Sequence, residues 1–594
     1  MIKGTPVCAG VALGPILVYH VEEMQAERLT LSDERLEAEL QRFRAAVQQA
    51  GRELTDIKDR LEGAHGNDAT LAVFDAQLLM LDDPMFTGAV SEQMRAQKVN
   101  AEWAVHLVMQ ELVAQFSAID DAYFRERLAD IHDVGRRIMH VLQEKQRPDL
   151  ATLAEPVILV ARELLPSELA AIPFDRLAGI VTEDGSTTSH TAIMARARGI
   201  PALVGASGAI GIVHNGALAI LDAQQGKLIL TPTDKVVAAY RALAARLAVT
   251  AAAQRAAAQQ PAVTRDGVAV AVWGNVDSPD EVPALLAAGG DGVGLFRSEY
   301  LFLSSERIPD EEQQYLTYRR LVLACAGRPV VIRTFDLGGD KLADLGQEPD
   351  PNPFLGVRAI RLGFAHRQLL HDQICAILRA AYHGDVRLMV PMISAVEEVR
   401  RVRKVIGECA NDLAKRGLAH RRDVPVGAMI EVPGAAIALD TIISDVDFIS
   451  LGTNDLVQYT LAAERGNRGV TDYYQPLHPA VLRLLAAVAR LARDAGRPVS
   501  VCGELAWDPV FVVFFTGLGM DCLSLGATNI PAVKLLVRAL TAKECRKHTD
   551  ELLAQGSTRA VISYAARTLI PRLSKLLPGL QCAGGVCRLP PATD

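Results

Sequence analysis

The spacing of apolar positions changes along the chain, and each change marks a different kind of structure. In the first long segment, apolar residues recur every three, four or seven positions, which predicts amphipathic helices. The expected helices cover residues 32–62, 68–81, 99–116 and 120–144. Because helices joined by short connections are typical of antiparallel bundles, we expect a four-helix bundle within residues 21–146.

Short apolar strands flank this helical region on both sides. Residues 1–20 alternate apolar stretches with glycine turns, which predicts one or two strands. Four further strands are expected downstream, at residues 156–160, 178–182, 202–204 and 217–221. We therefore expect a small α/β domain made of residues 1–20 and 147–232, with the helical bundle inserted after residue 20.

The second half of the chain shows a regular alternation of strand and helix patterns. An alanine-rich helical connector is expected over 233–260, since its apolar face is weak. Candidate strands then end near Gly274, Phe296, Thr334, Met392, Glu431, Leu451, Gly503 and Leu525. Eight strand–helix repeats in about 250–300 residues are typical of a (β/α)₈ TIM barrel, which we expect over 261–575, with a tail at 576–594.

Composition limits the function classes without choosing one. The chain has 594 residues, of which 50% are apolar and 22% charged, and several soluble domains are expected. No uncharged apolar run reaches membrane-spanning length, so no membrane association is expected. Nine scattered cysteines favour reduced thiols and a cytoplasmic location.

Negative charge is concentrated in the helical region. Residues 21–146 hold 24 Asp and Glu against 14 Lys and Arg, whereas the whole chain carries a net charge of -8. An acidic surface argues against nucleic acid as a partner and favours a basic protein. Asp75, Asp82 and Asp83 are candidates for one acidic face, with ordinary solvation as the alternative.

One segment, 185–196, places four small hydroxyl residues, Ser186 to Ser189, directly before a histidine, His190. Helix-forming residues follow the histidine, and Gly199 to Pro201 ends them. His190 is therefore expected in the first turn of a helix, behind a hydroxyl N-cap. The positive end of the helix dipole disfavours an imidazolium and keeps the ring neutral and nucleophilic.

The same helix end is suited to binding an anion through its free N–H groups. A histidine that accepts a phosphoryl group needs both a neutral ring and an anion site. The hydroxyls of Thr188, Ser189 and Thr191 are candidates to hold the phosphoryl oxygens. The alternative is that His190 packs or caps the helix locally.

Charged side chains follow several of the expected barrel strands, where TIM-barrel enzymes place their chemistry. Four arginines have the planar fork that binds phosphate and carboxylate oxygens in pairs, namely Arg297, Arg333, Arg358 and Arg465. Glu431 and Asp455 are a plausible pair of carboxylate ligands for Mg²⁺. For each arginine alone a structural ion pair is the better explanation, but together these residues indicate a small phosphorylated carboxylate as substrate.

Cys502 lies just after another expected strand. A buried inert thiol is the default interpretation. The alternative is a proton donor, because a thiol is suited to protonating an enolate carbon. A second cysteine pair, Cys582 and Cys587, has no nearby histidine, and a disordered reduced tail is expected there.

Several long motifs, in order, resemble one enzyme family. The sequence Thr-Ser-His-Thr-Ala-Ile-Met-Ala-Arg around His190 resembles the phosphohistidine signature of enzyme I, the phosphoenolpyruvate–protein phosphotransferase of bacterial phosphotransferase systems. The barrel motifs beginning at Asp336, Asn352, Gly452 and Cys502 resemble those of the same family, and the resemblance covers nearly the full length. Gly185-Ser-Thr departs from the more usual glycine-pair start of the signature.

The resemblance implies a complete reaction scheme. The barrel is expected to bind phosphoenolpyruvate and Mg²⁺, and His190 to take the phosphoryl group as a tele-phosphohistidine, leaving pyruvate. The helical region is expected to bind a small carrier protein, HPr or a paralogue, and the barrel to form a homodimer. By analogy the residues divide into substrate ligands (Arg297, Arg333, Arg358, Asn454 and Arg465), metal ligands (Glu431 and Asp455) and the proton donor Cys502.

Two other functions remain open at this point. A dikinase or phosphoenolpyruvate synthase shares the phosphohistidine and barrel parts, but it needs a nucleotide-binding domain. Residues 21–146 contain no glycine-rich phosphate loop. A non-catalytic scaffold with the same fold is the other alternative, and the retention of His190, Arg333, Glu431 and Cys502 together argues against it.

Overall fold

A computed structural model describes most of the chain. The residues outside its description are 1, 9, 20–25, 64–73, 75–76, 79, 82–83, 118–132, 144–152, 154, 165–167, 169–171, 173–175, 186–190, 193–194, 196–198, 304–307, 339–351, 466, 577–580, 584–585 and 589–594. Two compact units divide between residues 248 and 249, and each is described by itself.

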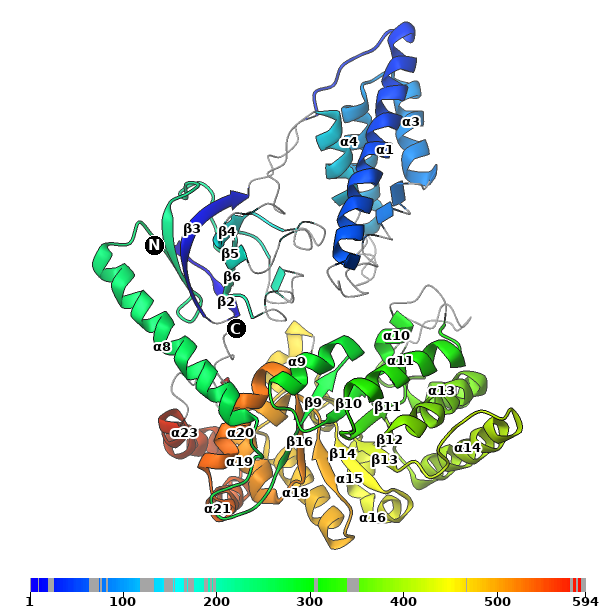
Figure 1. Ribbon diagram of the computed structural model, residues 1–594, viewed down its shortest axis with the longest axis vertical. Coiled ribbons are helices and arrows are strands. Elements are labelled where there is room, and N and C mark those ends of the chain that lie inside the picture. Colours follow the sequence, from blue (N-terminus) through cyan, green and yellow to red (C-terminus); the bar gives the residue numbers. More distant parts are fainter. Residues whose placement is uncertain are drawn as a thin grey trace. The chain divides into compact units, whose positions relative to one another are not determined.

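The first unit contains a twisted sheet built from both flanks of the helical region (Figure 1). Its strands are β1 (Ile2–Lys3), β2 (Thr5–Cys8), β3 (Val11–Tyr19), β4 (Val157–Ala161), β5 (Leu177–Thr182), β6 (Ala202–Val204), β7 (Leu218–Asp222) and β8 (Lys227–Leu230). They are arranged in the order β1-β8-β7-β3-β4-β5-β6-β2. The expected small α/β architecture is therefore confirmed.

The long strand β3 holds the two flanks together. It pairs parallel with β4 from Ile16 to Tyr19 and antiparallel with β7 from Val11 to Pro15. Every residue of β4 is buried, which explains its unbroken apolar run. The expectation of one or two strands in residues 1–20 was too low, because this segment contains three, β1, β2 and β3. Strand β8 was missed, since it is short and only partly buried.

The helical region forms its own apolar core. Its helices include α1 (Asp33–Gly63), α3 (Pro84–Gln97) and α4 (Ala101–Ser117). Residues 133–142 are also helical, within the helix expected over 120–144. Phe43, Leu54, Val90 and Val105 are buried in one cluster. Helix α3 falls between the helices expected over 68–81 and 99–116 and was missed. Asp75, Asp82 and Asp83 lie outside the described residues.

The second unit is a closed barrel of eight parallel strands surrounded by helices (Figure 1). Its strands are β9 (Ala271–Val276), β10 (Val293–Arg297), β11 (Val330–Arg333), β12 (Val386–Val390), β13 (Val426–Ile430), β14 (Phe448–Leu451), β15 (Val499–Val501) and β16 (Cys522–Leu525). Strand β16 pairs with β9 and closes the barrel. Each strand ends within two residues of the expected position, so the TIM barrel is confirmed.

Helices lie between successive strands and after β16, and they surround the barrel. They are α9 (Val282–Ala287), α10 (Glu299–Leu303), α11 (Glu311–Ala324), α12 (Ile360–Ala365), α13 (Arg367–Ala380), α14 (Val396–Lys415), α15 (Pro433–Ile437), α16 (Leu439–Ile442), α17 (Thr453–Leu461), α18 (Pro479–Asp494), α19 (Pro509–Leu518), α20 (Ile530–Ala539), α21 (Ala542–Ala554), α22 (Thr558–Tyr564) and α23 (Ile570–Leu576). Inside the barrel, Leu295, Val331, Met389, Met429 and Phe448 pack around Cys502.

The segments on either side of the barrel are the connector before it and the tail after it. The connector is one helix, α8 (Asp234–Ala258), as expected. The tail expected to be disordered instead contains two antiparallel strands, β17 (Gln581–Ala583) and β18 (Val586–Arg588), with Cys582 opposite Cys587. The sequence signal for this hairpin is the Gly-Gly pair between the two cysteines, because such pairs are typical of two-residue hairpin turns. The expectation of a disordered tail did not take this signal into account.

None of the helices in the described part of the chain combines the length and the apolar character that a bilayer crossing requires.

Candidate active site at the strand ends of the barrel

The barrel gathers most of the expected site residues at one end. Arg297 and Arg333 are the last residues of β10 and β11. Glu431 directly follows β13, and Cys502 directly follows β15. Asp455 lies in the first turn of α17, just after β14. Since all eight strands are parallel, these positions share the carboxyl end of the barrel, the usual catalytic face of this fold.

Arg333 is a buried cation between two carboxylates. Its Nη2 lies 3.0 Å from Glu299 Oε1, and its Nη1 lies 3.4 Å from Asp336 Oδ2. Burial lowers the pKa of Arg333, but Glu299 and Asp336 outweigh that effect and raise the pKa overall. Its Nε is buried and has no hydrogen-bond partner within the described part of the chain. The Arg333 guanidinium therefore retains one N–H donor, on Nε, that could bind an anion.

Arg358 connects the acidic residues of neighbouring strand ends. Its Nη2 donates to both Asp336 oxygens at 2.9 Å, and its Nη1 lies 3.8 Å from Asp455 Oδ1. Nη1 also donates to the Tyr459 hydroxyl at 3.2 Å. Burial lowers the pKa of Arg358, but Asp336 and Asp455 raise it overall. The guanidinium therefore stays charged and fixes Asp336 in place.

Two further arginines lie at the exposed rim of this region. Arg297 binds Asp277 through two hydrogen bonds, from Nε at 2.5 Å and from Nη2 at 2.8 Å. Its charge lowers the pKa of Cys502, which places it within electrostatic reach of that thiol. Arg465 is exposed, and its charge lowers the pKa of Asp455. Both arginines thus present charge toward the buried groups.

Glu431 and Asp455 form an electrostatically strained pair. Burial is the largest cause of the raised pKa of Glu431, and Asp455 and Asp336 raise it further. Burial also raises the pKa of Asp455, against the opposing effect of Arg358. Glu431 Oε1 accepts a hydrogen bond from the Met392 N–H at 2.7 Å. A divalent cation between the carboxylates would relieve their repulsion, so this donor set fits a hard metal ion.

Asn454 and Cys502 are held by neighbouring backbone groups. Asn454 Oδ1 accepts a hydrogen bond from the Glu504 N–H at 3.0 Å. The Cys502 thiol donates to the Leu451 carbonyl at 3.5 Å, and burial raises its pKa to about 11. A Cβ atom on Gly503 would lie 1.8 Å from Thr453 Oγ1, so only glycine allows this close approach. Cys502 is therefore a protonated thiol in a fixed position.

The segment that follows the expected phosphohistidine begins a helix. His190, Thr188 and Ser189 lie outside the described residues. Immediately afterwards Thr191 and Ala192 are helical, and Gly199 has a φ of 68°. These neighbours agree with the expected helix start and with its end at Gly199.

Two site residues were missed by sequence reasoning. Glu299 lies two positions after the end of β10, and its carboxylate binds both Arg333 and the Asp336 N–H. Tyr459 lies one turn after Asp455 on α17 and contacts Arg358. A search for polar residues within two positions of a strand end would have identified Glu299. A search one helical turn beyond a candidate site residue would have identified Tyr459.

Comparison with known proteins agrees with this arrangement. Residues 251–542 match the PEP-binding domain of PEP-utilising enzymes, 153–226 match their mobile domain, and 3–127 match their N-terminal domain. The phosphoenolpyruvate-protein phosphotransferase of Geobacillus stearothermophilus is 36% identical over 568 residues, which is 96% of this chain and 98% of that protein.

Two other relatives carry the same name. The protein of Bacillus subtilis is 36% identical over 96% of this chain and 99% of its own length. The protein of Haemophilus influenzae is 36% identical over 95% of this chain and 98% of its own length. In each comparison, the similarity therefore covers nearly the full length of this chain and of its relative.

Proposed function

The chain belongs to the phosphoenolpyruvate–protein phosphotransferase family, and we propose that it phosphorylates its own His190 from phosphoenolpyruvate. It is an enzyme that carries out the first step of a phosphotransferase system, passing the phosphoryl group on to a carrier protein and releasing pyruvate. The observation that carries the proposed site is the convergence of Arg333, Arg358, Glu431 and Asp455 at one end of a closed barrel.

The arginines are assigned to the substrate oxygens. Arg333 has a free Nε donor, and its fork matches a phosphate or carboxylate edge. Arg358 keeps Asp336 and Asp455 in position, while Arg297 and Arg465 add charge from the rim. Asn454 contributes its side-chain amide. Phosphoenolpyruvate carries both a phosphate and a carboxylate, which accounts for the number of cations.

Glu431 and Asp455 are assigned as ligands of the divalent metal that this family uses, which we propose is Mg²⁺. The bound ion would neutralise charge on the phosphoryl oxygens. Glu431 is oriented by the Met392 N–H, and Asp455 by Arg358.

Cys502 is assigned as the proton donor. Transfer breaks the P–O bond of phosphoenolpyruvate, forms an N–P bond at Nε2 of His190, and leaves the enolate of pyruvate. The Cys502 thiol gives its proton to the methylene carbon, and the resulting thiolate recovers a proton from solvent. Its raised pKa keeps the proton on sulfur until the enolate forms.

The remaining expectations concern partners and location. We propose that the acidic helical region binds an HPr-type carrier and that the barrels pair as a homodimer. We place the reaction in the cytoplasm, where thiols such as Cys502 stay reduced. Neither nucleic acid nor a membrane is proposed as a partner.

The direct test of the function is a stoichiometric assay. The purified chain is mixed with labelled phosphoenolpyruvate and Mg²⁺, and pyruvate and protein-bound label are measured together. We expect one pyruvate for each label incorporated, and transfer of that label to an added HPr-type carrier. ATP consumption with pyruvate would instead indicate a dikinase, and the absence of any label would indicate a scaffold.

A further inference from the structure

A second group of candidate metal ligands lies in the helical layer outside the barrel, away from the strand ends. His371 and Cys375 are four residues apart on α13, so their side chains share one face of the helix. Cys409 lies on the neighbouring helix α14. A nitrogen or sulfur atom from each of these three residues lies within 4.8 Å of the others.

The spacing agrees with tetrahedral coordination. Cys375 Sγ lies 3.7 Å from His371 Nδ1 and 4.0 Å from its Nε2. Bond lengths of about 2.3 Å to sulfur and about 2.0 Å to nitrogen imply a sulfur–nitrogen separation of roughly 3.6 Å across a tetrahedral zinc ion. Cys375 Sγ and His371 Nδ1 are therefore already close to the separation that a shared ion requires, and the ligand atom of Cys409 lies within 4.8 Å of both residues.

Both thiols of the cluster are buried and form no disulfide. Cys375 and Cys409 are free cysteines with completely buried side chains. Cys375 is close enough to share a hydrogen bond with Cys409, and this contact raises the pKa of Cys409, followed by burial and by the charges of Glu408 and Asp412. Glu408 also lines the adjoining cavity, together with Arg367 and Arg401.

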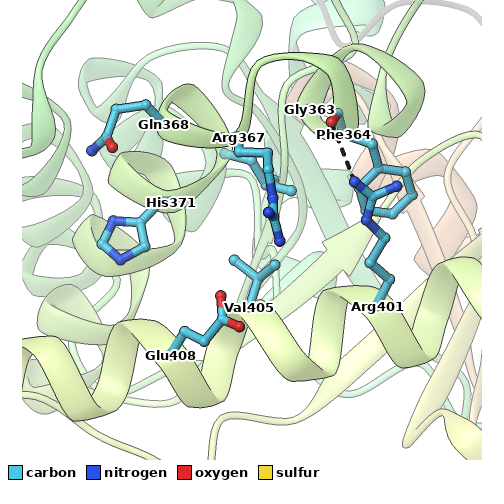
Figure 2. A pocket seen from close by; sticks show the side chains of 9 residues that line it. Gly363, Phe364, Arg367, Gln368, His371, Arg401, Val405 and Glu408 are labelled. Atoms are coloured by element: carbon cyan, nitrogen blue, oxygen red, sulfur yellow. Dashed lines mark hydrogen bonds between the residues drawn. The ribbon is translucent and has the colours of Figure 1, made fainter.

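One side of the cluster opens into a cavity of about 230 Å³ between α13 and α14. Figure 2 shows His371 and Gln368 on one wall and Val405 and Glu408 on the other. His371 is 27% exposed, whereas both cysteines are buried. An ion bound by the three side chains would therefore have room for a water molecule as its fourth ligand on the cavity side.

We propose that His371, Cys375 and Cys409 bind one Zn²⁺ ion that joins α13 to α14. Two thiolates and an imidazole form a soft ligand set that selects zinc over Mg²⁺. The site differs in chemistry from Glu431 and Asp455, which offer only oxygen. It stands independently of the phosphotransfer reaction, because its ligands lie on the helices and not at the strand ends.

Cobalt substitution in the full-length chain tests the proposal. Protein purified under reducing conditions is stripped with a chelator and titrated with Co²⁺ in excess Mg²⁺, which occupies oxygen-ligand sites. We expect one Co²⁺ per chain with a near-ultraviolet sulfur-to-cobalt charge-transfer band, and displacement of that band by Zn²⁺. Cys375→Ser and Cys409→Ser should abolish the band, and His371→Asn should weaken Co²⁺ binding at least about tenfold.

Cys325→Ser provides the matched control, since Cys325 is equally buried but is not part of the cluster. This variant should keep the band unchanged. Circular dichroism and pyruvate formation check that each variant is folded. A band that is missing from the wild type, or that survives both cluster substitutions, would overturn the proposal. A Cys375–Cys409 disulfide found by mass mapping in the reduced preparation would overturn it as well.

Discussion

Arg358 donates hydrogen bonds to both carboxylate oxygens of Asp336, and each oxygen lies 2.9 Å from the same nitrogen, Nη2. Both side chains are largely buried, with exposed fractions of 10% and 5%. The pair lies beside Asp455, whose Oδ1 is 3.8 Å from Arg358 Nη1. One guanidinium thus balances two of the carboxylates that surround the proposed metal position.

Removing this guanidinium should destabilise the barrel. Arg358→Met leaves the buried Asp336 with only the longer contact to Arg333, which costs roughly 3 kcal/mol of unfolding free energy, the lower end of the cost of breaking a buried pair. Arg400 also binds both oxygens of its partner Asp445, from Nε and Nη2, but this pair is more exposed, and Arg400→Met should cost at most about 1 kcal/mol. Urea unfolding of both variants measures the difference. Equal losses would show that burial of the Arg358 pair does not matter.

Arg333 should be irreplaceable by lysine. Arg333→Lys keeps the charge but removes the fork whose Nε is free for substrate. The loss of one charged hydrogen bond predicts a fall in kcat/KM for phosphoenolpyruvate of roughly 10–100-fold. Arg403→Lys, on the outer helix α14, is the control and should retain wild-type kinetics. Unchanged kinetics in Arg333→Lys would remove this fork from the substrate site.

Gly452 should be required for metal binding. A Cβ atom at this position would lie 2.6 Å from Glu431 Oε2, so Gly452→Ala must displace the carboxylate. We expect the Mg²⁺ concentration for half-maximal activity to rise about 10–100-fold. Gly434→Ala, where a Cβ meets nothing within 4 Å, should leave the Mg²⁺ dependence unchanged. The account would fail if both variants responded alike to Mg²⁺.

The barrel topology followed from the sequence, while the ion-pair network did not. Alternation of apolar and polar runs located all eight strand ends, because buried parallel strands must be apolar and their ends polar. The sequence pattern identified Arg358 as a site residue, but it did not predict that Arg358 binds Asp336. The bidentate contact with Asp336 depends on how the 352–359 loop folds back over the strand ends, and local periodicity carries no information about such long-range contacts.

The helical region shows a different limit. Helix α3 begins at Pro84 and has a weak apolar stripe, so its spacing resembled that of a loop. Only contacts with other helices bury Val90 and Met94 completely. Tertiary packing therefore decides this element, since its own propensity is modest.

Loss of the Cys502 proton should slow pyruvate formation only at very high pH. A proton donor must be protonated, and burial raises its pKa to about 11. The rate of single-turnover pyruvate formation should therefore not decline through Cys502 between about pH 6 and 9. Cys502→Ser should slow this step more than it weakens substrate binding, since a hydroxyl is a poorer acid. A decline near pH 8 that Cys502→Ser abolishes would contradict the raised pKa.

The identity of the phosphorylated residue tests the central claim most directly. After incubation with phosphoenolpyruvate and Mg²⁺, peptide mapping under alkaline conditions should find one acid-labile phosphoryl group, on His190. His190→Ala should carry none, although it still binds phosphoenolpyruvate in the barrel. A phosphoryl group of the same stoichiometry on the alanine variant would place the acceptor elsewhere and contradict the account.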